Sequence, residues 1–330
     1  YTYMDNKKRY IYLDTVAGVL IIYMIFMHCC QFTYMTDTQM FKILQMSFVG
    51  FMAWFFFKSG MFYKENVTIR DTVKKSIEKI AKPYLSFLII GYVLLCLFLL
   101  LKNSDWSLYV RVPIKQIVMG GGGHSWGLHL WFLVCLMCTK CFSCFLIKVK
   151  LWGVILIGLL GLALSYISLN IVELRPYWGI NIFPAMFFYG VGYYLKQIQF
   201  NKYIVYTAFF VYVISIFLYP SYVSFQSNRL CYGLYLLWLL YAIANIVAWN
   251  NISRVLPNGI PLVTQIGKQS LYWYAAHWMF ICIIREIFKL LGNPLSNGQS
   301  LIIMFFFVIL LLYLLKPLVY NTRLKRLLGF

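Results

Sequence analysis

The chain has 330 residues, of which 62% are hydrophobic, 20% are aromatic and only 12% are charged, and its formal net charge is +20. Its mean hydropathy of +0.76 lies far outside the range of soluble globular domains. These values exclude a soluble enzyme and indicate a protein that crosses a membrane several times.

Apolar runs of about 17 to 25 residues, long enough to cross a hydrocarbon core as helices, recur along the whole chain. Transmembrane strands would instead alternate in character over about ten residues. We therefore expect an all-α transmembrane bundle of about ten spans that forms one integral-membrane domain over residues 1–330. The predicted spans are residues 11–31, 43–62, 84–101, 126–147, 151–169, 181–197, 203–219, 230–249, 269–288 and 300–317.

The basic residues are divided unevenly between the two sides of this bundle. If the N-terminus is cytoplasmic, the inside segments carry 19 of the 29 Lys and Arg residues and the outside segments carry 8. Because cytoplasmic loops are enriched in Lys and Arg, we expect both termini in the cytoplasm. This topology and contact with anionic lipid head groups account for the positive charge, so no nucleic-acid partner is expected.

The first predicted span, DTVAGVLIIYMIFMH at its core, carries ionisable residues at both ends of one helical face. No small-residue cleavage site follows it, so we expect the span to be retained. His28 lies eleven residues after Ala17, about 20° around a helix, and Asp14 lies on nearly the same stripe. This face suits a conduit from a cytoplasmic cofactor to a buried reacting centre. Alternatively, His28 only hydrogen-bonds a neighbouring helix.

The polar segment 63–83 has the pattern of a basic amphipathic helix. Apolar residues recur every three or four positions from Ile69 to Ile80, with lysines between them, and Pro83 would open the next span. We expect this helix, near 66–82, on the cytoplasmic interface. We expect it to be either a lipid-binding anchor or part of a binding site for an anionic ligand such as a nucleotide phosphate.

The second polar segment, 102–125, ends in four consecutive glycines at 120–123. Such a run lets the backbone bend sharply or approach a ligand closely. His124 and His129 follow at the membrane edge, where we expect both to lie near water. The segment is expected to be either a flexible outer loop or a re-entrant wall of a substrate site.

Four cysteines spaced three apart in the predicted span 126–147 superficially resemble a metal-ligand set. On a helix, however, this spacing drifts by about 60° at each step. Four thiolates in hydrocarbon would also be costly without a metal ion. We therefore expect small packing residues here and predict neither a metal site nor a disulfide framework. The residues are Cys135, Cys138, Cys141 and Cys144.

A second intramembrane histidine, His277, lies in the apolar sequence WYAAHWMF. Ser270, Tyr274 and His277 share one helical face by their i, i+4 and i+7 spacing. As with His28, a functional role and a plain hydrogen bond to another helix are both open.

Five fragments, in order along nearly the whole chain, resemble the membrane acyltransferase 3 family, which acylates sugars and envelope polymers in bacteria. The resemblance implies a bundle of about ten helices in the cytoplasmic (inner) membrane. It also implies an acyl-CoA donor, usually acetyl-CoA, and a carbohydrate hydroxyl of a polysaccharide or lipid-linked glycan as acceptor. The fragments are RYIYLDTVAGVLIIYMIFMH at 9–28, FFFKSGMFYK at 55–64, KKSIEKIAKPY at 74–84, HLWFL at 129–133 and IGKQSLYWYAAH at 266–277.

The resemblance points to specific residues in these fragments, and their chemistry suits acyl transfer. Moving an acyl group from a thioester to an alcohol needs a base and donors that stabilise the developing oxyanion. We expect His28 to be the general base or a transient acyl carrier, with Asp14 and His277 as further catalytic residues. The expected donor-binding residues are Lys58, Ser59, Arg70, Lys74, Lys75 and Lys82. The expected acceptor-binding residues are His129, Trp131, Ser270 and Tyr274, and Gly18 and Gly60 also match the family pattern.

The chain departs from the family pattern at Ala17, because the family keeps a basic residue eleven positions before the histidine. Another cation could substitute, this subgroup could work differently, or the chain could be an inactive scaffold of an envelope-assembly complex. A transporter or flippase for a lipid-linked glycan or small solute is the further alternative. The candidate substitutes are Arg9, Lys58, Arg70 and Lys82.

Overall fold

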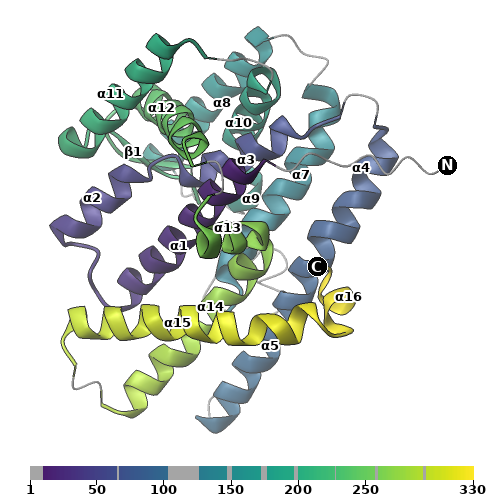
Figure 1. Ribbon diagram of the computed structural model, residues 1–330, viewed down its shortest axis with the longest axis vertical. Coiled ribbons are helices and arrows are strands. Elements are labelled where there is room, and N and C mark those ends of the chain that lie inside the picture. The colour runs from purple at the N-terminus through teal and green to yellow at the C-terminus, as the bar shows by residue number, and fades with distance from the viewer. Residues whose placement is uncertain are drawn as a thin grey trace.

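The computed structural model is a bundle of helices with one short β-hairpin (Figure 1). Six helices or helical stretches in the described part of the chain are long and apolar enough to cross a membrane, and three shorter apolar helices accompany them. The structure describes residues 10–64, 67–102, 126–146, 151–171, 177–196, 200–226, 228–256, 259–292 and 295–330.

The first half of the chain begins with one unbroken apolar helix and then a broken one. The predicted span 43–62 is two helices, because the chain turns at residues 48–50. Phe48 and Val49 are themselves apolar, so hydropathy gives no sign of this turn. The elements are α1 (Ile11–Phe32), α2 (Gln39–Ser47), α3 (Phe51–Met61), α4 (Ile69–Ser76), η1 (Ile77–Ala81), α5 (Lys82–Leu101), η2 (Leu128–Leu130) and α7 (Trp131–Leu146).

The predicted basic amphipathic helix is present and runs directly into the next span. Thr68 caps α4 by accepting a hydrogen bond from the Asp71 amide at 3.1 Å. The chain then passes through the π-helical segment η1 into α5, with Pro83 in the first turn of α5. Because the helix continues through this point, Pro83 removes one backbone donor from it, and the π-helical turn lies just before the proline. Short π-helical segments, with hydrogen bonds between residues five apart, often occur at functional sites.

The second half of the chain contains the hairpin that an all-α prediction misses. β1 and β2 are antiparallel and pair Tyr222 with Tyr232. The hairpin is too short for a hydropathy pattern to mark it. The elements are α8 (Leu151–Asn170), α9 (Tyr177–Ile180), α10 (Ile182–Leu195), α11 (Lys202–Leu218), β1 (Tyr222–Ser224), β2 (Arg229–Tyr232), α12 (Tyr235–Arg254), α13 (Pro261–Lys268), α14 (Ser270–Leu290), α15 (Asn297–Tyr320) and α16 (Leu324–Leu328).

The helix α1 lies at the centre of the bundle and contacts α3, α12, α13, α14 and α15. Its closest approach is to α13, through two glycines. A Cβ atom at Gly18 would clash with the Val263 carbonyl group, and one at Gly267 would clash with the Asp14 carbonyl oxygen. Only glycine allows the two backbones this close. This contact fixes the half of α1 that carries Asp14.

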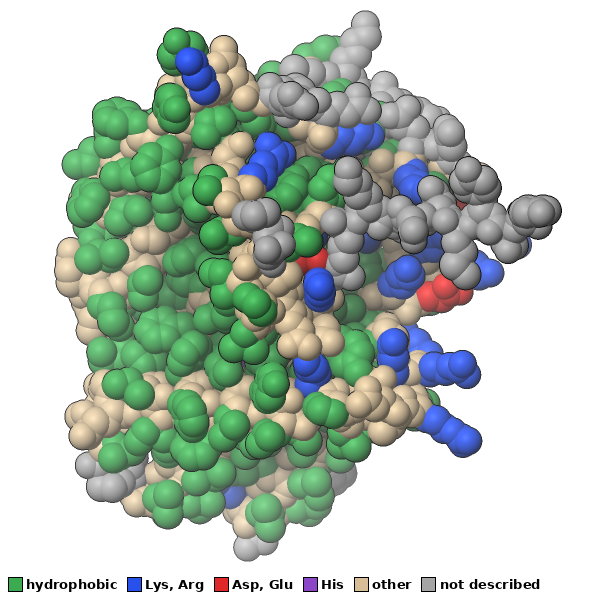
Figure 2. All heavy atoms as spheres, viewed as in Figure 1, with side chains coloured by type: hydrophobic (Ala, Val, Ile, Leu, Met, Phe, Trp, Pro, Cys, Tyr) green, Lys and Arg blue, Asp and Glu red, His purple; other side chains and the backbone are tan. Residues whose placement is uncertain are grey.

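Each predicted span overlaps a helix or a pair of helices, although the span 230–249 begins in β2 and continues into α12. The number of spans and the cytoplasmic placement of the termini stay predictions. Basic side chains are concentrated on one part of the surface. In Figure 2, Lys and Arg side chains gather at the right of the view, over α4 and α16, and hydrophobic side chains cover much of the rest. Apolar surface exposed on this scale suits contact with lipid.

Candidate active site

A cavity of about 560 Å³ lies between α1, α3, α4, η1, α7 and α14. Part of its lining is apolar and part carries basic side chains. Apolar side chains such as Ile21, Met24 and Phe132 form part of its wall. Among the described residues that line it, none is Asp or Glu. The five lysines in the lining are Lys58, Lys64, Lys75, Lys79 and Lys140.

Lys58 places a cation beside the first half of α1. Its Nζ atom lies 3.6 Å from Asp14 Oδ1 and donates a hydrogen bond to the Leu13 carbonyl oxygen at 3.4 Å. The Asp14 side chain is only 7% exposed and that of Lys58 is 21% exposed, so water screens the pair weakly. Ala17 is buried one turn further along α1. Lys58 therefore supplies a positive charge one helical turn from the position where the resemblance expects one.

Of the four candidates for that cation, the structure brings Lys58 to Asp14. Arg70 and Lys82 are exposed and do not line the cavity. Arg9 lies outside the described residues.

Three histidines from three different elements form a cluster. His28 of α1 stacks on His277 of α14, with ring centroids 5.3 Å apart and planes 21° apart. His129 of η2 meets His277 edge-on, with centroids 4.9 Å apart. Trp278 closes the group, because its ring lies 4.9 Å from His28 and 5.8 Å from His129. Residues almost 250 positions apart in the sequence thus share one small volume.

Hydrogen bonds fix the protonated nitrogen of each imidazole. His277 Nδ1 lies 2.7 Å from the Tyr274 carbonyl oxygen, and His129 Nε2 lies 3.0 Å from the Ala275 carbonyl oxygen. His28 Nδ1 lies 2.9 Å from Gln31 Oε1. Since an oxygen of this kind only accepts, the nitrogen facing it donates. The lone pairs of the neutral rings are then on His28 Nε2, His129 Nδ1 and His277 Nε2.

The three rings differ in accessibility. His277 and His129 are buried, and their lone-pair nitrogens have no hydrogen-bond partner among the described residues. His28 is only partly buried. A substrate can therefore reach the ring of His28 more easily than the other two, while His277 and His129 lie behind it.

Two helices connect the cavity to this cluster. On α1, Ile21 and Met24 line the cavity, and His28 follows on the same face, about 6 Å beyond Met24. On α14, Ser270 and Tyr274 line the cavity, and His277 follows one turn later. The Tyr274 hydroxyl donates a hydrogen bond to the His129 carbonyl oxygen. The arrangement can deliver a ligand held by the lysines to the imidazole of His28.

The structure brings together part of the predicted site. Lys58, Ser59, Lys75, Ser270 and Tyr274 line the cavity. Asp14 pairs with Lys58, and His28, His129 and His277 form a cluster outside the lining. Lys74, like Arg70 and Lys82, is exposed outside the lining. Trp131 is buried and packs on Phe132 and Phe225, outside the lining as well.

The expectation that His129 lies near water is wrong. Its side chain is only 5% exposed and packs among aromatic rings. Its position just before α7, next to the polar segment 102–125, suggested the membrane edge, and only the fold shows that α14 covers it. His124 and the glycines 120–123 lie outside the described residues.

Sequence reasoning missed three lysines of the cavity and the partner of His28. Lys64 and Lys79 belonged to the basic segment, but nothing in the pattern separated them from their neighbours. Lys140 gave a usable signal, because a charge inside a predicted span usually faces an aqueous cavity. Gln31 lies one turn after His28, a spacing that permits a side-chain hydrogen bond on a helix.

The four spaced cysteines form no metal site among the residues that the structure describes, where no group of three or more His, Cys, Asp or Glu side chains could hold a metal ion. Cys135 and Cys144 are buried, and Cys138 and Cys141 are partly buried. All four are free thiols.

A second, smaller cavity of about 340 Å³ lies at the other end of α14. It is lined by the end of α1 and residues that follow it, the end of α14 and the start of α15. Gln31, the hydrogen-bond partner of His28, belongs to this lining. The histidine cluster therefore lies between two cavities.

A comparison with known families identifies this architecture. A family model described as an acyltransferase domain, acyltransferase 3, matches residues 10–317, which is nearly the whole chain. This match confirms the resemblance carried by the five sequence fragments. No curated protein and no solved structure matches the chain significantly.

Proposed function

The chain belongs to the acyltransferase 3 family, and from that premise we propose that it is a membrane-bound O-acyltransferase. The donor is acyl-CoA, with acetyl-CoA as the expected form, and the acceptor is a hydroxyl of a cell-envelope or exported polysaccharide. The site of action is the bacterial cytoplasmic membrane. One observation carries the proposal: a cavity lined by five lysines is bounded by α1 and α14, and the same two helices carry His28 and His277 one turn beyond the lining residues Met24 and Tyr274.

The lining of the larger cavity suits coenzyme A. CoA carries several phosphate charges on its nucleotide and a long, weakly polar arm that ends in the thioester. Lysines bind phosphates as point charges, and five of them face this cavity without a carboxylate in its described lining. The apolar wall at Ile21, Met24 and Phe132 suits the arm. The thioester would then point toward His28.

His28 is the proposed general base. The acceptor hydroxyl oxygen attacks the thioester carbonyl carbon, and His28 Nε2 takes the hydroxyl proton. The carbon–sulfur bond then breaks, and the imidazolium returns the proton to the departing CoA sulfur. The hydrogen bond from Nδ1 to Gln31 holds the ring in the tautomer that this step needs. The serine hydroxyls of Ser59 and Ser270 line the same cavity and can donate to the developing oxyanion.

The other two histidines support this ring. His277 stacks on it and His129 packs against His277, and the hydrogen bonds of both to α14 carbonyl groups fix their orientation. Three imidazoles this close cannot all be charged, because like charges in a low dielectric repel strongly. The cluster thus favours a neutral base before reaction.

Radiolabel transfer tests the proposal directly. Purified protein is incubated with acetyl-CoA labelled in the acetyl group and with glycan isolated from the cell envelope, and label in the glycan is counted. We expect label in the glycan with the natural chain and background label with His28→Gln. A transporter, flippase or scaffold would leave the glycan unlabelled in both samples, and that result would reject the enzyme.

A further inference from the structure

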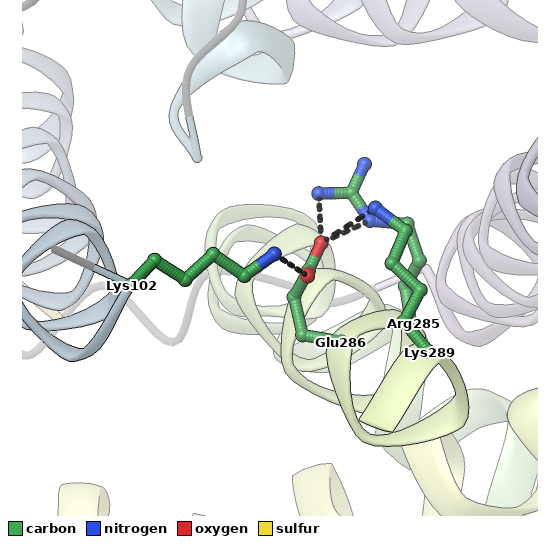
Figure 3. A network of polar contacts seen from close by, with 4 residues as sticks. All are labelled: Lys102, Arg285, Glu286 and Lys289. Atoms are coloured by element: carbon green, nitrogen blue, oxygen red, sulfur yellow. Dashed lines mark hydrogen bonds and ion pairs between the residues drawn. The ribbon is translucent and has the colours of Figure 1, made fainter. Parts of the chain in front are cut away.

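Beside the smaller cavity lies a cluster of four charged residues that the catalytic proposal does not use, and two of them, Arg285 and Lys289, line the cavity. Glu286 of α14 accepts contacts from three cations: Arg285 Nη2 at 2.8 Å, Lys289 Nζ at 3.0 Å and Lys102 Nζ at 3.4 Å. In Figure 3 all four side chains point toward one another, Lys102 from the residue that directly follows α5 and the other three from α14. One negative charge is shared by three positive ones, so these four residues carry a net charge of +2.

Glu286 holds the cations in place. Its side chain is only 7% exposed, and two nitrogens of Arg285, Nε and Nη2, contact the same carboxylate oxygen. The Arg285 guanidinium group also lies over the Phe32 ring, 4.9 Å from its centroid. A guanidinium group fixed in this way has a defined direction, unlike an exposed lysine. The cluster is therefore built to present positive charge at one place.

That place faces the smaller cavity. Arg285 and Lys289 line it, and the Lys289 side chain is 58% exposed, so a ligand can reach it. The rest of the lining combines hydroxyl and amide groups with apolar side chains. Sugars need both, because their hydroxyl groups hydrogen-bond and their carbon faces pack on apolar surface. The polar residues are Gln31, Thr33, Asn297 and Ser300, and the apolar ones are Phe32, Tyr34, Phe288 and Met304.

The cavity is also connected to the proposed base. Gln31 lines the cavity and bonds to His28. Phe32 packs on Trp278 at 5.2 Å, and Trp278 packs on His28. Arg285 lies eight residues after His277 on the same helix, about 12 Å along its axis. A glycan whose charge is held by Arg285 and Lys289 can therefore extend a hydroxyl group toward His28.

We propose that the smaller cavity is the acceptor site and that it selects glycans carrying an anionic group, a carboxylate or a phosphate, near the acylated sugar. This inference rests on the proposed function, because it names the class of acceptor for that reaction. Arg285 and Lys289 line the cavity and belong to a group of four residues whose net charge is +2. This positive charge beside sugar-binding groups favours a negatively charged sugar over a neutral one.

A matched series of oligosaccharides tests this selectivity by binding alone. Cellotetraose, its C6-oxidised tetraglucuronate and its C6-phosphorylated form share one backbone and differ in charge. Calorimetry on the full chain in nanodiscs of phosphatidylcholine gives their affinities. We expect each anionic form to bind at least about tenfold more tightly than cellotetraose. Equal affinity for all three would overturn the proposal.

Variants of Arg285 and Lys289 test whether these residues cause the preference for anionic oligosaccharides. Arg285→Gln or Lys289→Gln should reduce the preference for the anionic forms to about twofold or less, and Arg285→Lys should keep part of it. Lys42→Gln removes an exposed lysine of α2 outside this lining and should leave the preference intact. A preference that survives both glutamine variants would overturn the assignment. Size-exclusion chromatography confirms that each variant is folded.

The same series separates a glycan from a lipid head group. In nanodiscs of phosphatidylglycerol, a glycan site should still bind tetraglucuronate. Loss of that binding would show that an anionic lipid takes the cavity and would reject the glycan. Acetyl transfer is measured independently. Absent transfer with intact anionic binding would reject only the proposed function, and intact transfer without charge preference would reject only this inference.

Discussion

The two ends of α14 carry positive charge in different ways. At its start, the larger cavity is lined by five lysines without a carboxylate among its described lining residues. One of these lysines, Lys58, pairs with Asp14. At its end, three cations converge on Glu286 and are held by it. Long lysine side chains around an open cavity can follow a flexible ligand with several phosphates. A fixed arginine cluster instead recognises one charge at one position.

From this difference we infer complementary proposed roles for the two ends of α14, donor binding at its start and acceptor binding at its end, with the histidine cluster between them. The donor, whose nucleotide is the same for every acyl-CoA, needs affinity. The acceptor, which differs between glycans, needs selectivity. Variants of His28 and of residues at the start of α14 and around the larger cavity test these proposed roles.

The largest effect is expected for His28→Ala. Removing a general base typically costs about 10²- to 10⁴-fold in rate. We expect kcat for acetyl transfer to fall by about that factor, with acetyl-CoA binding unchanged, because the lysines proposed to hold CoA are untouched. The measurement pairs transfer kinetics with acetyl-CoA calorimetry. Retention of full activity would remove His28 from the mechanism.

Lys58→Met should have the next largest effect, on stability as well as activity. It leaves the buried Asp14 carboxylate without this cation, and breaking a buried pair commonly costs about 3–5 kcal/mol. Because Lys58 is partly exposed, we expect about 1–3 kcal/mol, seen as a lower Tm. The double variant Asp14→Asn with Lys58→Met should recover much of that Tm. No recovery would mean that the two residues act separately.

Gly267→Ala tests the packing that positions Asp14. The added methyl group would meet the Asp14 carbonyl oxygen, so α13 must move away from α1. Overpacking of this kind costs about 1–3 kcal/mol, and thermal unfolding of the purified protein should show it. Gly298→Ala is the matched control, because a Cβ atom there meets no other atom within 4 Å. Equal Tm values for the two variants would contradict the close contact.

The smallest effect separates two adjacent lysines of α4. Lys75 lines the cavity and Lys74 does not, although both are exposed. Losing one hydrogen bond to a phosphate should raise KM for acetyl-CoA about three- to tenfold in Lys75→Ala, while Lys74→Ala should stay near the natural value. The difference should shrink at high salt. Equal KM values for both variants would place the CoA phosphates elsewhere.

The sequence predicted the helical bundle well, because hydropathy reports length and apolar character directly. It did not reveal the turn at 48–50, since that turn is apolar, or the hairpin at 222–232, which is too short to show a period. The site was predicted in part. His28 and His277 stood out as ionisable groups in apolar sequence.

Contacts between distant segments could not be predicted. His129 meets His277 only because η2 packs on α14, and Lys58 reaches Asp14 only because α3 packs beside α1. Neither contact can be predicted from the residue pattern of a single helix. Residues on one helix, such as Asp14 and His28, could be aligned by counting, whereas partners from other helices needed the fold.

Photocrosslinking with a photoreactive CoA analogue tests the division of roles most directly. The full chain in nanodiscs is labelled, digested and sequenced by mass spectrometry, with unlabelled acetyl-CoA as competitor. If CoA binds in the larger cavity, we expect competable label in the peptides that carry Lys58 to Lys79 and Phe132 to Lys140. Competable label confined to the peptides that carry Arg285 to Met304 would contradict it, because CoA would then occupy the cavity assigned to the acceptor.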